Sequence, residues 1–204
     1  MNKRDDTLSE SSVDPNPFRQ FEKWYKDRLS GDMSIPNSMS LGTASADGHV
    51  SVRTVLMKEF DESGFVFFTN YNSTKGTHLQ ANPNASLLFY WPELNRQIRI
   101  EGAVKKITKM ESESYFKTRP AENNISVWAS EQSSVIPDRK FLENRFDYFR
   151  KKFENESIRR PVYWGGFRLI PTWFEFWQEG KYRLHDRISY TLERNVWKIE
   201  RLAP

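Results

Sequence analysis

The sequence predicts an α+β protein, a single domain built on an antiparallel β-barrel with helices at its ends. Two observations predict this class. From Ser38 to Ile107, and again after Trp164, short apolar or alternating runs recur at intervals of roughly 10–20 residues without long helices between them, which favours antiparallel strands. Residues 17–29 and 109–153 instead carry apolar side chains at helical spacing. At 204 residues the chain is long enough to bury one sizeable core.

The first residues differ in composition from the rest of the chain. Residues 1–14 are polar and mixed in charge, which predicts a disordered N-terminal tail ahead of one domain over 15–204. Asn16 and Pro17 are typical of a helix N-cap and first helical position, so an amphipathic helix is expected over 17–29. The apolar residues of this helix, at i, i+3 and i+7, are Phe18, Phe21 and Tyr25.

The strands of the predicted barrel follow this helix. Residues 50–57 alternate between a more apolar face and a second face, which is the period of a strand. Gly64 opens another run after a turn-like DESG, and residues 70–81 have the polar character of a short helical connection that stops near Pro83. The further strands expected here have the sequences FVFFTN, SLLFYW and RQIRIEGAVKKI.

Residues 109–153 are expected to be helical, after which the chain returns to strands. Apolar residues at i, i+4, i+7 and i+11 predict a helical stripe that faces the core. The members of this stripe are Leu142, Phe146, Phe149 and Phe153. The strands expected downstream have the sequences WGGFRLI, TWFEFWQ, KYRLHDRISY and NVWKIERL.

The run Trp173–Trp177 bears on assembly. Trp173 and Trp177 lie on one face of the expected strand, and Phe174 and Phe176 lie on the other. A strand that is apolar on both faces has to be covered on both faces. In a chain this small, a second subunit is the expected cover, so the pattern predicts a homodimer.

The composition excludes several kinds of active site. The chain has no cysteine and three histidines, which rules out disulfides, thiolate metal sites, iron–sulfur clusters and cysteine nucleophiles and argues against a His-rich metal site. None of its nine glycines forms a G-x-G-x-x-G or G-x-x-x-x-G-K-[ST] motif. No metal is therefore expected, and an enzyme of this composition needs a borrowed cofactor.

Charge and hydropathy limit the expected location and partners. Lys plus Arg (31) minus Asp plus Glu (27) gives +4, and the basic residues are scattered, so no nucleic acid is expected as a partner. The N-terminus lacks the apolar segment of a signal peptide, and the longest apolar run, Leu87 to Trp91, is too short to cross a bilayer. A cytoplasmic protein with no membrane partner is expected.

The segment RLHDR is the most informative local feature. If it forms a strand, Arg183, His185 and Arg187 project from one face. Three such groups repel one another unless an anion or neighbouring acids neutralise them. The pattern is therefore compatible with a phosphate site, in which His185 donates a hydrogen bond, but taken alone it favours a solvated face paired with acidic residues.

Other residues add anion-binding and ring-binding capacity. Lys75 follows Ser73 and Thr74 at an expected helix start, which suits phosphate but also describes an ordinary N-cap beside a surface lysine. Tyr115 and Arg119 lie one helical turn apart and share a face, where they could grip one phosphate. Further candidates are Arg53, Lys58 and Gln97, with Trp128, Trp164 and Trp177 as ring-flanking groups. Two phosphorylated aromatic small molecules fit this inventory.

A set of motifs runs in order from Pro17 to Pro204. It comprises VRTVLMKEFDESGFVFFTN, NRQIRIEG, YFKTRP, SEQSSVI, WGGFR, EFWQ, RLHDR and the terminal WKIERLAP. In these motifs the chain strongly resembles the pyridoxamine 5′-phosphate oxidase family. The resemblance implies a split β-barrel homodimer with FMN at the subunit interface. It also implies oxidation of pyridoxine 5′-phosphate or pyridoxamine 5′-phosphate to pyridoxal 5′-phosphate, with O₂ as acceptor, H₂O₂ as product and ammonia released from the amine.

The resemblance also implies roles for individual residues. Arg53, Lys75 and Ser133 would hold mainly the FMN phosphate, while Arg183 and His185 would face the pyridine ring as the catalytic residues. Hydrogen would pass as a hydride equivalent from substrate C4′ to flavin N5. The residues implied to contact FMN are Arg53, Thr54, Val55, Leu56, Met57, Lys58, Phe68, Thr69, Lys75, Gln97, Gln132, Ser133, Trp177 and Arg187. Those implied to contact the substrate are Lys58, Tyr115, Arg119, Asn123, Arg183 and His185.

The chain departs from the family pattern in three places. Thr74 stands where an Arg is usual beside the phosphate-binding Lys, and Asn123 replaces a Ser. Ser126 and Val127 are bulkier than the usual Gly and Ala. The N-terminal segment lacks the Tyr that often closes over substrate, since no Tyr precedes Tyr25. Two alternatives therefore remain beside the oxidase: a related split-barrel flavin oxidase acting on another ring system, such as a phenazine precursor, and a non-catalytic protein that binds flavin or pyridoxal phosphate.

Overall fold

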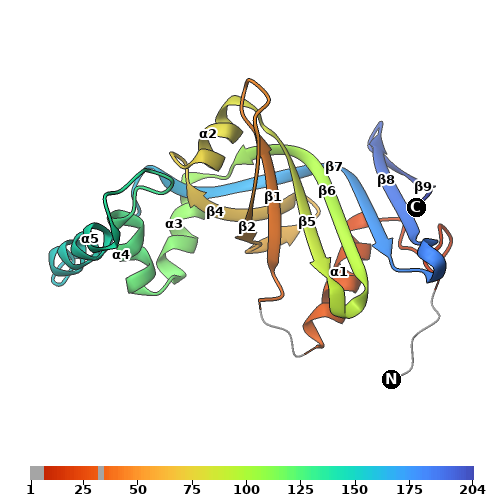
Figure 1. Ribbon diagram of the computed structural model, residues 1–204, viewed down its shortest axis with the longest axis horizontal. Helices are drawn as coiled ribbons and strands as arrows, with labels where there is room; N and C mark the ends of the chain where they lie inside the picture. Colours follow the sequence, from red (N-terminus) through yellow and green to blue (C-terminus); the bar gives the residue numbers. More distant parts are fainter. Residues whose placement is uncertain (1–6, 32–34) are drawn as a thin grey trace.

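The computed structural model describes residues 7–31 and 35–204 and confirms the α+β class. One curled antiparallel sheet forms the body of the molecule, and helices lie around it (Figure 1). The strands are β1 (Ser38–Ala44), β2 (Val50–Leu56), β3 (Glu59–Asp61), β4 (Gly64–Asn70), β5 (Asn84–Trp91), β6 (Arg96–Lys106), β7 (Trp164–Gln178), β8 (Asp186–Glu193) and β9 (Val196–Arg201). The helices are α1 (Pro17–Leu29), α2 (Thr74–Ala81), α3 (Lys109–Thr118), α4 (Ala121–Ala129) and α5 (Arg139–Lys152), with short 3₁₀ turns η1 (Pro92–Leu94) and η2 (Lys181–Arg183).

The sheet curls into a half-barrel that opens along one side. Its strand order is β2-β1-β5-β6-β7-β4-β3, and β8 and β9 branch off β7. The two ends of this order approach each other where the Lys58 amide donates to the Val66 carbonyl at 2.8 Å. Strand β7 belongs both to the half-barrel and to the branch formed by β8 and β9, because its first half pairs with β4 and its second half with β8.

A β-bulge lies where β7 leaves the half-barrel and begins to pair with β8. The β6–β7 register shifts between Glu101 and Gly102, opposite Pro171. A Cβ at Gly102 would lie 2.0 Å from the Ile170 carbonyl oxygen, so only glycine permits this approach of the two strands. The bulge thus sets the direction in which the β8–β9 hairpin projects.

The expected helix over 17–29 is confirmed as α1. The Asn16 side chain caps it by accepting from the Phe18 amide, and Pro17 occupies the first turn. Phe21 is fully buried and packs edge-to-face on Phe89 at 5.0 Å between ring centroids. Trp24 reaches Phe176 in the same way. Helix α1 therefore covers the core formed by β4, β5 and β7.

Residues 7–14 are not a disordered tail, so that expectation is wrong for this part of the segment. Leu8 and Val13 are buried against the core. The Leu8 amide donates to Asp186 Oδ2 at 3.2 Å, and the Tyr190 hydroxyl donates to the Asp14 carbonyl at 2.7 Å. Two apolar side chains and a buried tyrosine hydroxyl that needs an acceptor hold the segment on β8. Residues 1–6 of the expected tail lie outside the described residues.

The helical region is confirmed in outline, but its apolar stripe does not face the core. Helices α3, α4 and α5 gather at one end of the molecule, across the barrel from β8 and β9 (Figure 1). Phe149 and Phe153 pack on Trp128, at 6.0 and 5.7 Å between ring centroids. The stripe is half-buried against its neighbouring helix because α5 lies beyond the barrel, where the main core ends.

The expected strand through RLHDR begins later than predicted. Strand β8 starts at Asp186, while Tyr182 and Arg183 have φ of +57° and +63° in the turn before it. Arg183, His185 and Arg187 consequently do not share one strand face. None of the helices in the described ranges is long and apolar enough to span a bilayer.

Candidate functional site

A cavity of about 670 Å³ lies between the barrel and helices α3 and α4. Its volume is typical of small-molecule and cofactor sites. Residues from β2, β4, α3, α4 and the loop after α4 line it, so segments far apart in the sequence meet there. The predicted site residues that it brings together are Leu56, Lys58, Phe68, Thr69, Tyr115, Arg119, Asn123 and Gln132.

Three stacked aromatic rings form one wall of this cavity. The Phe68 ring stacks on Tyr115 and on Trp164, with ring centroids 3.9 and 5.4 Å away, and the Tyr115 and Trp164 centroids lie 6.3 Å from each other. The Arg119 guanidinium lies 4.5 Å over the Trp164 ring. The expected shared face of Tyr115 and Arg119 is thus present and faces the cavity, and Trp164 is the ring-flanking tryptophan that the structure places there.

Arg119 has a donor to spare. Its Nη2 donates to the Asn123 carbonyl at 3.0 Å, whereas Nη1 is buried and has no partner among the described residues. Burial lowers the pKa of the guanidinium, because desolvation disfavours the charged form. A buried donor without a partner costs free energy, which an anion in the cavity would recover.

Lys75 is a buried lysine at the start of α2. The Ser73 side chain caps this helix by accepting from the Gly76 amide, as expected of an N-cap, but Lys75 is only 8% exposed and is not a surface lysine. Its Nζ donates to Thr69 Oγ1, Ser73 Oγ and Gln132 Oε1, all between 3.1 and 3.2 Å. Desolvation first, and then the charge of Arg53, lowers its pKa to about 8.

Arg53 lies close enough to Lys75 for the two charges to oppose each other. Its Nη1 donates to the Leu41 carbonyl at 2.9 Å and to Thr43 Oγ1 at 2.8 Å, and burial lowers its pKa. Across the described residues, neither cation forms an ion pair with a carboxylate. Two partly desolvated cations held by neutral oxygens fit a phosphate group, so the chemistry of the donors fits FMN.

The remaining residues that the resemblance implies for FMN differ in burial, and only some of them lie at the cavity. The Met57 side chain is buried in the core, and its amide donates to the Asn37 carbonyl at 2.9 Å. Thr54 is exposed on β2, and Val55 packs against the core. Ser133 is exposed beside Gln132 with φ of +76°, and it does not line the cavity.

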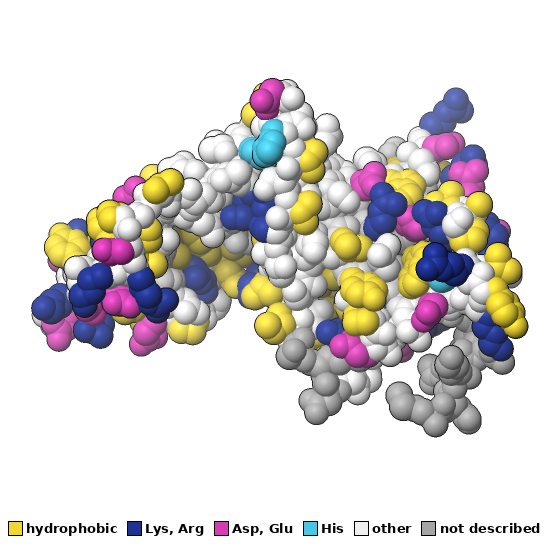
Figure 2. Space-filling view, in the orientation of Figure 1, with side chains coloured by type: hydrophobic (Ala, Val, Ile, Leu, Met, Phe, Trp, Pro, Cys, Tyr) yellow, Lys and Arg dark blue, Asp and Glu magenta, His cyan; other side chains and the backbone are white. Residues whose placement is uncertain are grey.

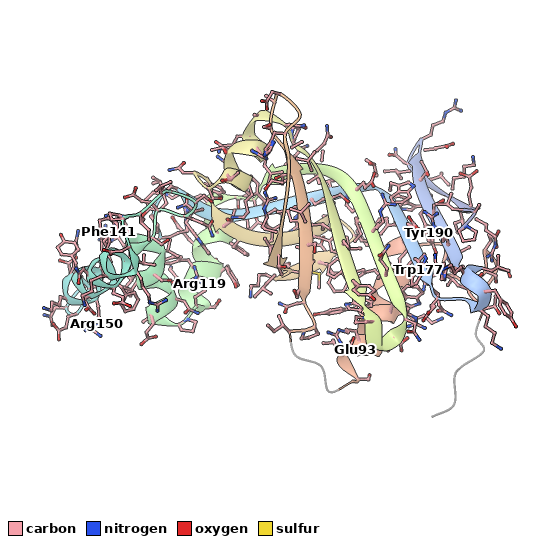
Figure 3. The ribbon with its side chains drawn as sticks, viewed as in Figure 1. Glu93, Arg119, Phe141, Arg150, Trp177 and Tyr190 are labelled. Carbon is pink, nitrogen blue, oxygen red and sulfur yellow. The ribbon has the colours of Figure 1, made fainter. Side chains whose placement is uncertain are left out.

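A second cluster of predicted residues lies on the far side of the barrel. Gln97, Trp177 and Arg187 are cross-strand neighbours on β6, β7 and β8. The His185 ring lies 4.7 Å from the Trp177 ring. Figure 3 shows Trp177 and Arg119, which belong to the two clusters, on opposite sides of the molecule. One chain does not bring them together.

The second cluster does not present three free cationic groups together, as the sequence pattern of Arg183, His185 and Arg187 suggested. Arg187 Nε donates to buried Glu175 at 2.6 Å, so an acid already neutralises it and raises its pKa. Arg183 is exposed and has no hydrogen-bond or ion-pair partner in the described part of the chain. His185 Nδ1 accepts from the Gly180 amide at 3.2 Å, which leaves the ring proton on Nε2. Arg183 and His185 can therefore both donate to a ligand.

Apolar side chains occupy the sheet face that carries the second cluster. Val50 and Val52 on edge strand β2 are 66% and 65% exposed, and Tyr90 on β5 is 60% exposed. The strand registers put them on the same face as Trp177. Figure 2 shows hydrophobic side chains in the middle of the view, where Figure 1 has these strands. Such a patch on a sheet edge favours association with another chain.

Sequence reasoning missed several residues of the cavity. Asn70, Thr118 and Ser130 line it, and Thr43 holds Arg53. Single polar residues of these types occur throughout the chain, so no local pattern distinguishes them. In the described ranges no cluster of His, Asp and Glu could hold a metal ion.

Comparison with known proteins adds a family relationship. The profile described as pyridoxamine 5′-phosphate oxidase matches residues 31–153, and that described as the pyridoxine 5′-phosphate oxidase C-terminal dimerisation region matches 164–204. A pyridoxine/pyridoxamine 5′-phosphate oxidase from Nostoc sp. is 52% identical over 97% of this chain and 92% of its own length. One from Cupriavidus taiwanensis is 50% identical over 97% and 93%.

Solved structures resemble the fold. PhzG from Burkholderia lata 383, in complex with tetrahydrophenazine-1-carboxylic acid, superposes with a TM-score of 0.91 at 29% identity and covers 98% of each chain. A pyridoxamine 5′-phosphate oxidase-related, FMN-binding protein from Nostoc punctiforme gives a TM-score of 0.72 at 17% identity, over 92% of this chain and 98% of its own. These superpositions confirm the antiparallel split barrel.

Proposed function

The chain belongs to the pyridoxamine 5′-phosphate oxidase family, and on this premise we propose that it oxidises pyridoxamine 5′-phosphate and pyridoxine 5′-phosphate to pyridoxal 5′-phosphate. FMN is the proposed cofactor, O₂ the acceptor and H₂O₂ the product. The observation that carries the proposal is a cavity with an aromatic wall and Arg119 in its lining, next to a second cationic position. That second position is Lys75 with Arg53, and Lys75 donates to Thr69 and Gln132, which line the cavity. Two phosphorylated ring compounds, cofactor and substrate, meet this demand.

The cofactor phosphate is proposed to lie between Arg53 and Lys75. Both cations are held by neutral oxygen atoms, so a phosphate would be a negative partner that no described residue provides. Thr69 and Gln132 orient Lys75 from β4 and from the loop after α4. When bound, FMN would supply the redox chemistry, taking a hydride equivalent from the substrate and passing the electrons to O₂.

The substrate phosphate is proposed to bind Arg119, Lys58 and Tyr115. Arg119 and Asn123 line the cavity together with Lys58, which is exposed, and the buried Nη1 of Arg119 has no hydrogen-bond partner among the described residues. Ring stacking with Phe68 fixes Tyr115. These groups anchor one end of the substrate and thereby orient its reacting carbon.

Arg183 and His185 are proposed to act on the substrate ring from a second copy of the chain. In one chain Trp177, whose ring the His185 ring contacts, lies across the barrel from Arg119, so a complete site needs both halves. The His185 Nε2 proton and the Arg183 guanidinium would hold the ring and stabilise negative charge on it. The exposed apolar face with Val52 and Tyr90, next to Trp177, is the proposed homodimer contact.

The experiment is a visible absorption spectrum of the purified protein, followed by anaerobic addition of pyridoxamine 5′-phosphate. The proposal predicts a flavin spectrum that bleaches on addition, and pyridoxal 5′-phosphate with H₂O₂ after air is admitted. A protein that takes up no FMN contradicts it. A protein that binds FMN but is not bleached by either B6 phosphate is a binding protein and not an oxidase.

A second candidate substrate class rests on a specific observation. PhzG, the structural neighbour, was solved with a reduced phenazine carboxylic acid, and here Asn123, Ser126 and Val127 line the cavity where the family pattern has smaller residues. Turnover of a tetrahydrophenazine carboxylate is the discriminating measurement. Faster turnover of that compound than of both B6 phosphates would favour this class.

A further inference from the structure

A chain of hydrogen bonds runs from Arg53 through Thr43 to His78, next to the cationic pair of Arg53 and Lys75. The ligand contacts proposed above do not explain it. Thr43 on β1 is 2% exposed and lies between Arg53 on β2 and His78 on α2. Arg53 Nη1 donates to Thr43 Oγ1 at 2.8 Å, and Thr43 Oγ1 lies 3.2 Å from His78 Nδ1. Three separate elements of the fold are joined through one hydroxyl group.

The protons of this chain can be assigned from the chemistry of its groups. A guanidinium only donates, so Thr43 Oγ1 accepts from Arg53 and keeps one proton of its own. Among the described residues, His78 Nδ1 is the one acceptor that the structure gives to this proton. Leaving a buried hydroxyl proton without an acceptor is costly, so the Thr43 hydroxyl donates to Nδ1 and His78 is the neutral tautomer with its proton on Nε2.

The chain also joins the two cations. His78 lies one helical turn after Lys75 on α2, and its ring is buried. Thr43 therefore ties the strand that carries Arg53 to the helix that carries Lys75. Among the residues described, no carboxylate pairs with Arg53 or Lys75, although a carboxylate is the commoner partner of a buried arginine.

We propose that Thr43 and His78 are positioning residues that hold Arg53 at the spacing from Lys75 that a phosphate group requires. The neutral Thr43 hydroxyl and His78 imidazole suit this role, because they orient the guanidinium without cancelling its charge. The inference rests on the proposed function, in which this phosphate is that of FMN. It assigns a role to two residues outside the sets proposed to contact cofactor and substrate.

The test compares the affinities of FMN and riboflavin, which differ by the phosphate. Thr43→Val removes the hydroxyl and keeps the shape, and Thr43→Ser keeps the hydroxyl. We expect Thr43→Val to weaken FMN by about tenfold, the effect of one lost hydrogen bond to a charged group, with riboflavin affinity unchanged. Thr43→Ser should bind both as the parent chain does. Fluorescence quenching of the two flavins measures the dissociation constants of the parent chain and both variants.

His78 offers an independent pair of variants. His78→Asn keeps an acceptor near Nδ1, whereas His78→Leu removes it. His78→Leu should lower FMN affinity as Thr43→Val does, His78→Asn should lower it less, and the double variant Thr43→Val with His78→Leu should be no weaker than either single one, because both break the same chain. His49 cannot serve as the control, because its ring packs edge-on against His78. Thr172→Val, at an exposed threonine on β7, is the control.

The outcomes separate the two proposals. If the parent chain binds neither flavin, the proposed function fails. If it prefers FMN to riboflavin and Thr43→Val and His78→Leu keep that preference, the positioning role is overturned while the function stands. An equal loss of both flavins in these variants also overturns it, because a general loss of structure does not select the phosphate. Should Thr43→Val not fold, the His78 pair decides alone.

Discussion

Lys75 illustrates how burial at a single residue changes the meaning of a motif. The Ser-Thr-Lys step predicts either a phosphate site or an N-cap beside a surface lysine. The structure contains the N-cap, but it also buries the lysine under Thr69 and Gln132. Gln132 lies 57 residues further along the chain, so no local pattern could have revealed that burial.

Replacing Lys75 with methionine should separate binding from stability. FMN affinity should fall by about 1.5–3 kcal/mol, the range for one hydrogen bond to a charged group. The cofactor-free protein should unfold at the same or a higher denaturant concentration, since a desolvated charge is removed and an apolar chain of similar length replaces it. FMN titration and urea unfolding measure the two effects. Unchanged FMN affinity would remove Lys75 from the site.

The pKa of Lys75 predicts opposite pH trends for stability and for FMN binding. Its folded-state pKa of about 8 lies below the ordinary value of 10.5, so between these values the unfolded chain binds more protons than the folded chain. Stability of the cofactor-free protein should therefore rise as the pH increases from about 8 towards 10. FMN affinity should fall over the same interval, by at most about tenfold per pH unit, because neutral Lys75 no longer attracts phosphate.

Lys75→Met is the control for both trends. The variant should lose the pH dependence of FMN affinity above pH 8 and the corresponding rise in stability. Calorimetric titration at several pH values, with thermal unfolding of the cofactor-free protein, provides the data. A variant with the same pH dependence as the parent chain would assign the titration to another group.

At the scale of elements, the period-two and helical patterns predicted most of the barrel and α1. They failed at RLHDR, because Tyr182 and Arg183 adopt positive φ in a turn where the sequence alternates like a strand. They also failed for the stripe on α5, which has helical periodicity but packs on α4 beyond the end of the core. Periodicity reports that a face is covered, and not which element covers it.

The bulge between β6 and β7 predicts that one methyl group added at Gly102 strongly lowers the free energy of unfolding. Gly102→Ala would place Cβ 2.0 Å from the Ile170 carbonyl oxygen and 2.9 Å from Pro171 Cα, both backbone atoms that cannot move aside alone. We expect a loss of about 2–4 kcal/mol in the free energy of unfolding. The change would also redirect the β8–β9 hairpin, which begins beyond the bulge.

Gly48→Ala is the matched control for this substitution. Gly48 has φ of +87° but no atom within 4 Å of an added Cβ, so the change should cost only about 1 kcal/mol of conformational strain. Thermal unfolding at one protein concentration compares the two variants. Equal stabilities would mean that the two strands separate at little cost.

At the scale of the whole molecule, the proposed interface predicts a change of oligomeric state. Val52→Asp would place a charge on the exposed apolar face of β2, and burying it unpaired in a dimer is costly. We expect a folded monomer with weakened FMN binding. Val162→Asp, at a valine that is 86% exposed outside this face, should remain a dimer. Sedimentation velocity distinguishes these outcomes, and a Val52→Asp dimer would move the contact elsewhere.

The separation of the two clusters is the feature that the sequence predicted least directly. The apolar run around Trp173 indicated a second subunit, and the family resemblance implied FMN at the subunit interface, but neither assigned the individual site residues to one chain or the other. Only the fold places Arg119 and Trp177, the ring neighbour of His185, on opposite sides of one chain. Each site is therefore proposed to use the cavity of one chain and the turn before β8 of another.

The most direct test of this composite site is complementation between two inactive variants. Arg119→Ala and Arg183→Ala are co-expressed with different affinity tags, and the mixed dimer is isolated by two successive purifications. Each variant alone should form little pyridoxal 5′-phosphate. The mixed dimer should recover about half of the parent activity, because one of its two sites is assembled from two intact halves. A mixed dimer as inactive as its parents would contradict the account, since it would mean that Arg119 and Arg183 serve the same site from one chain.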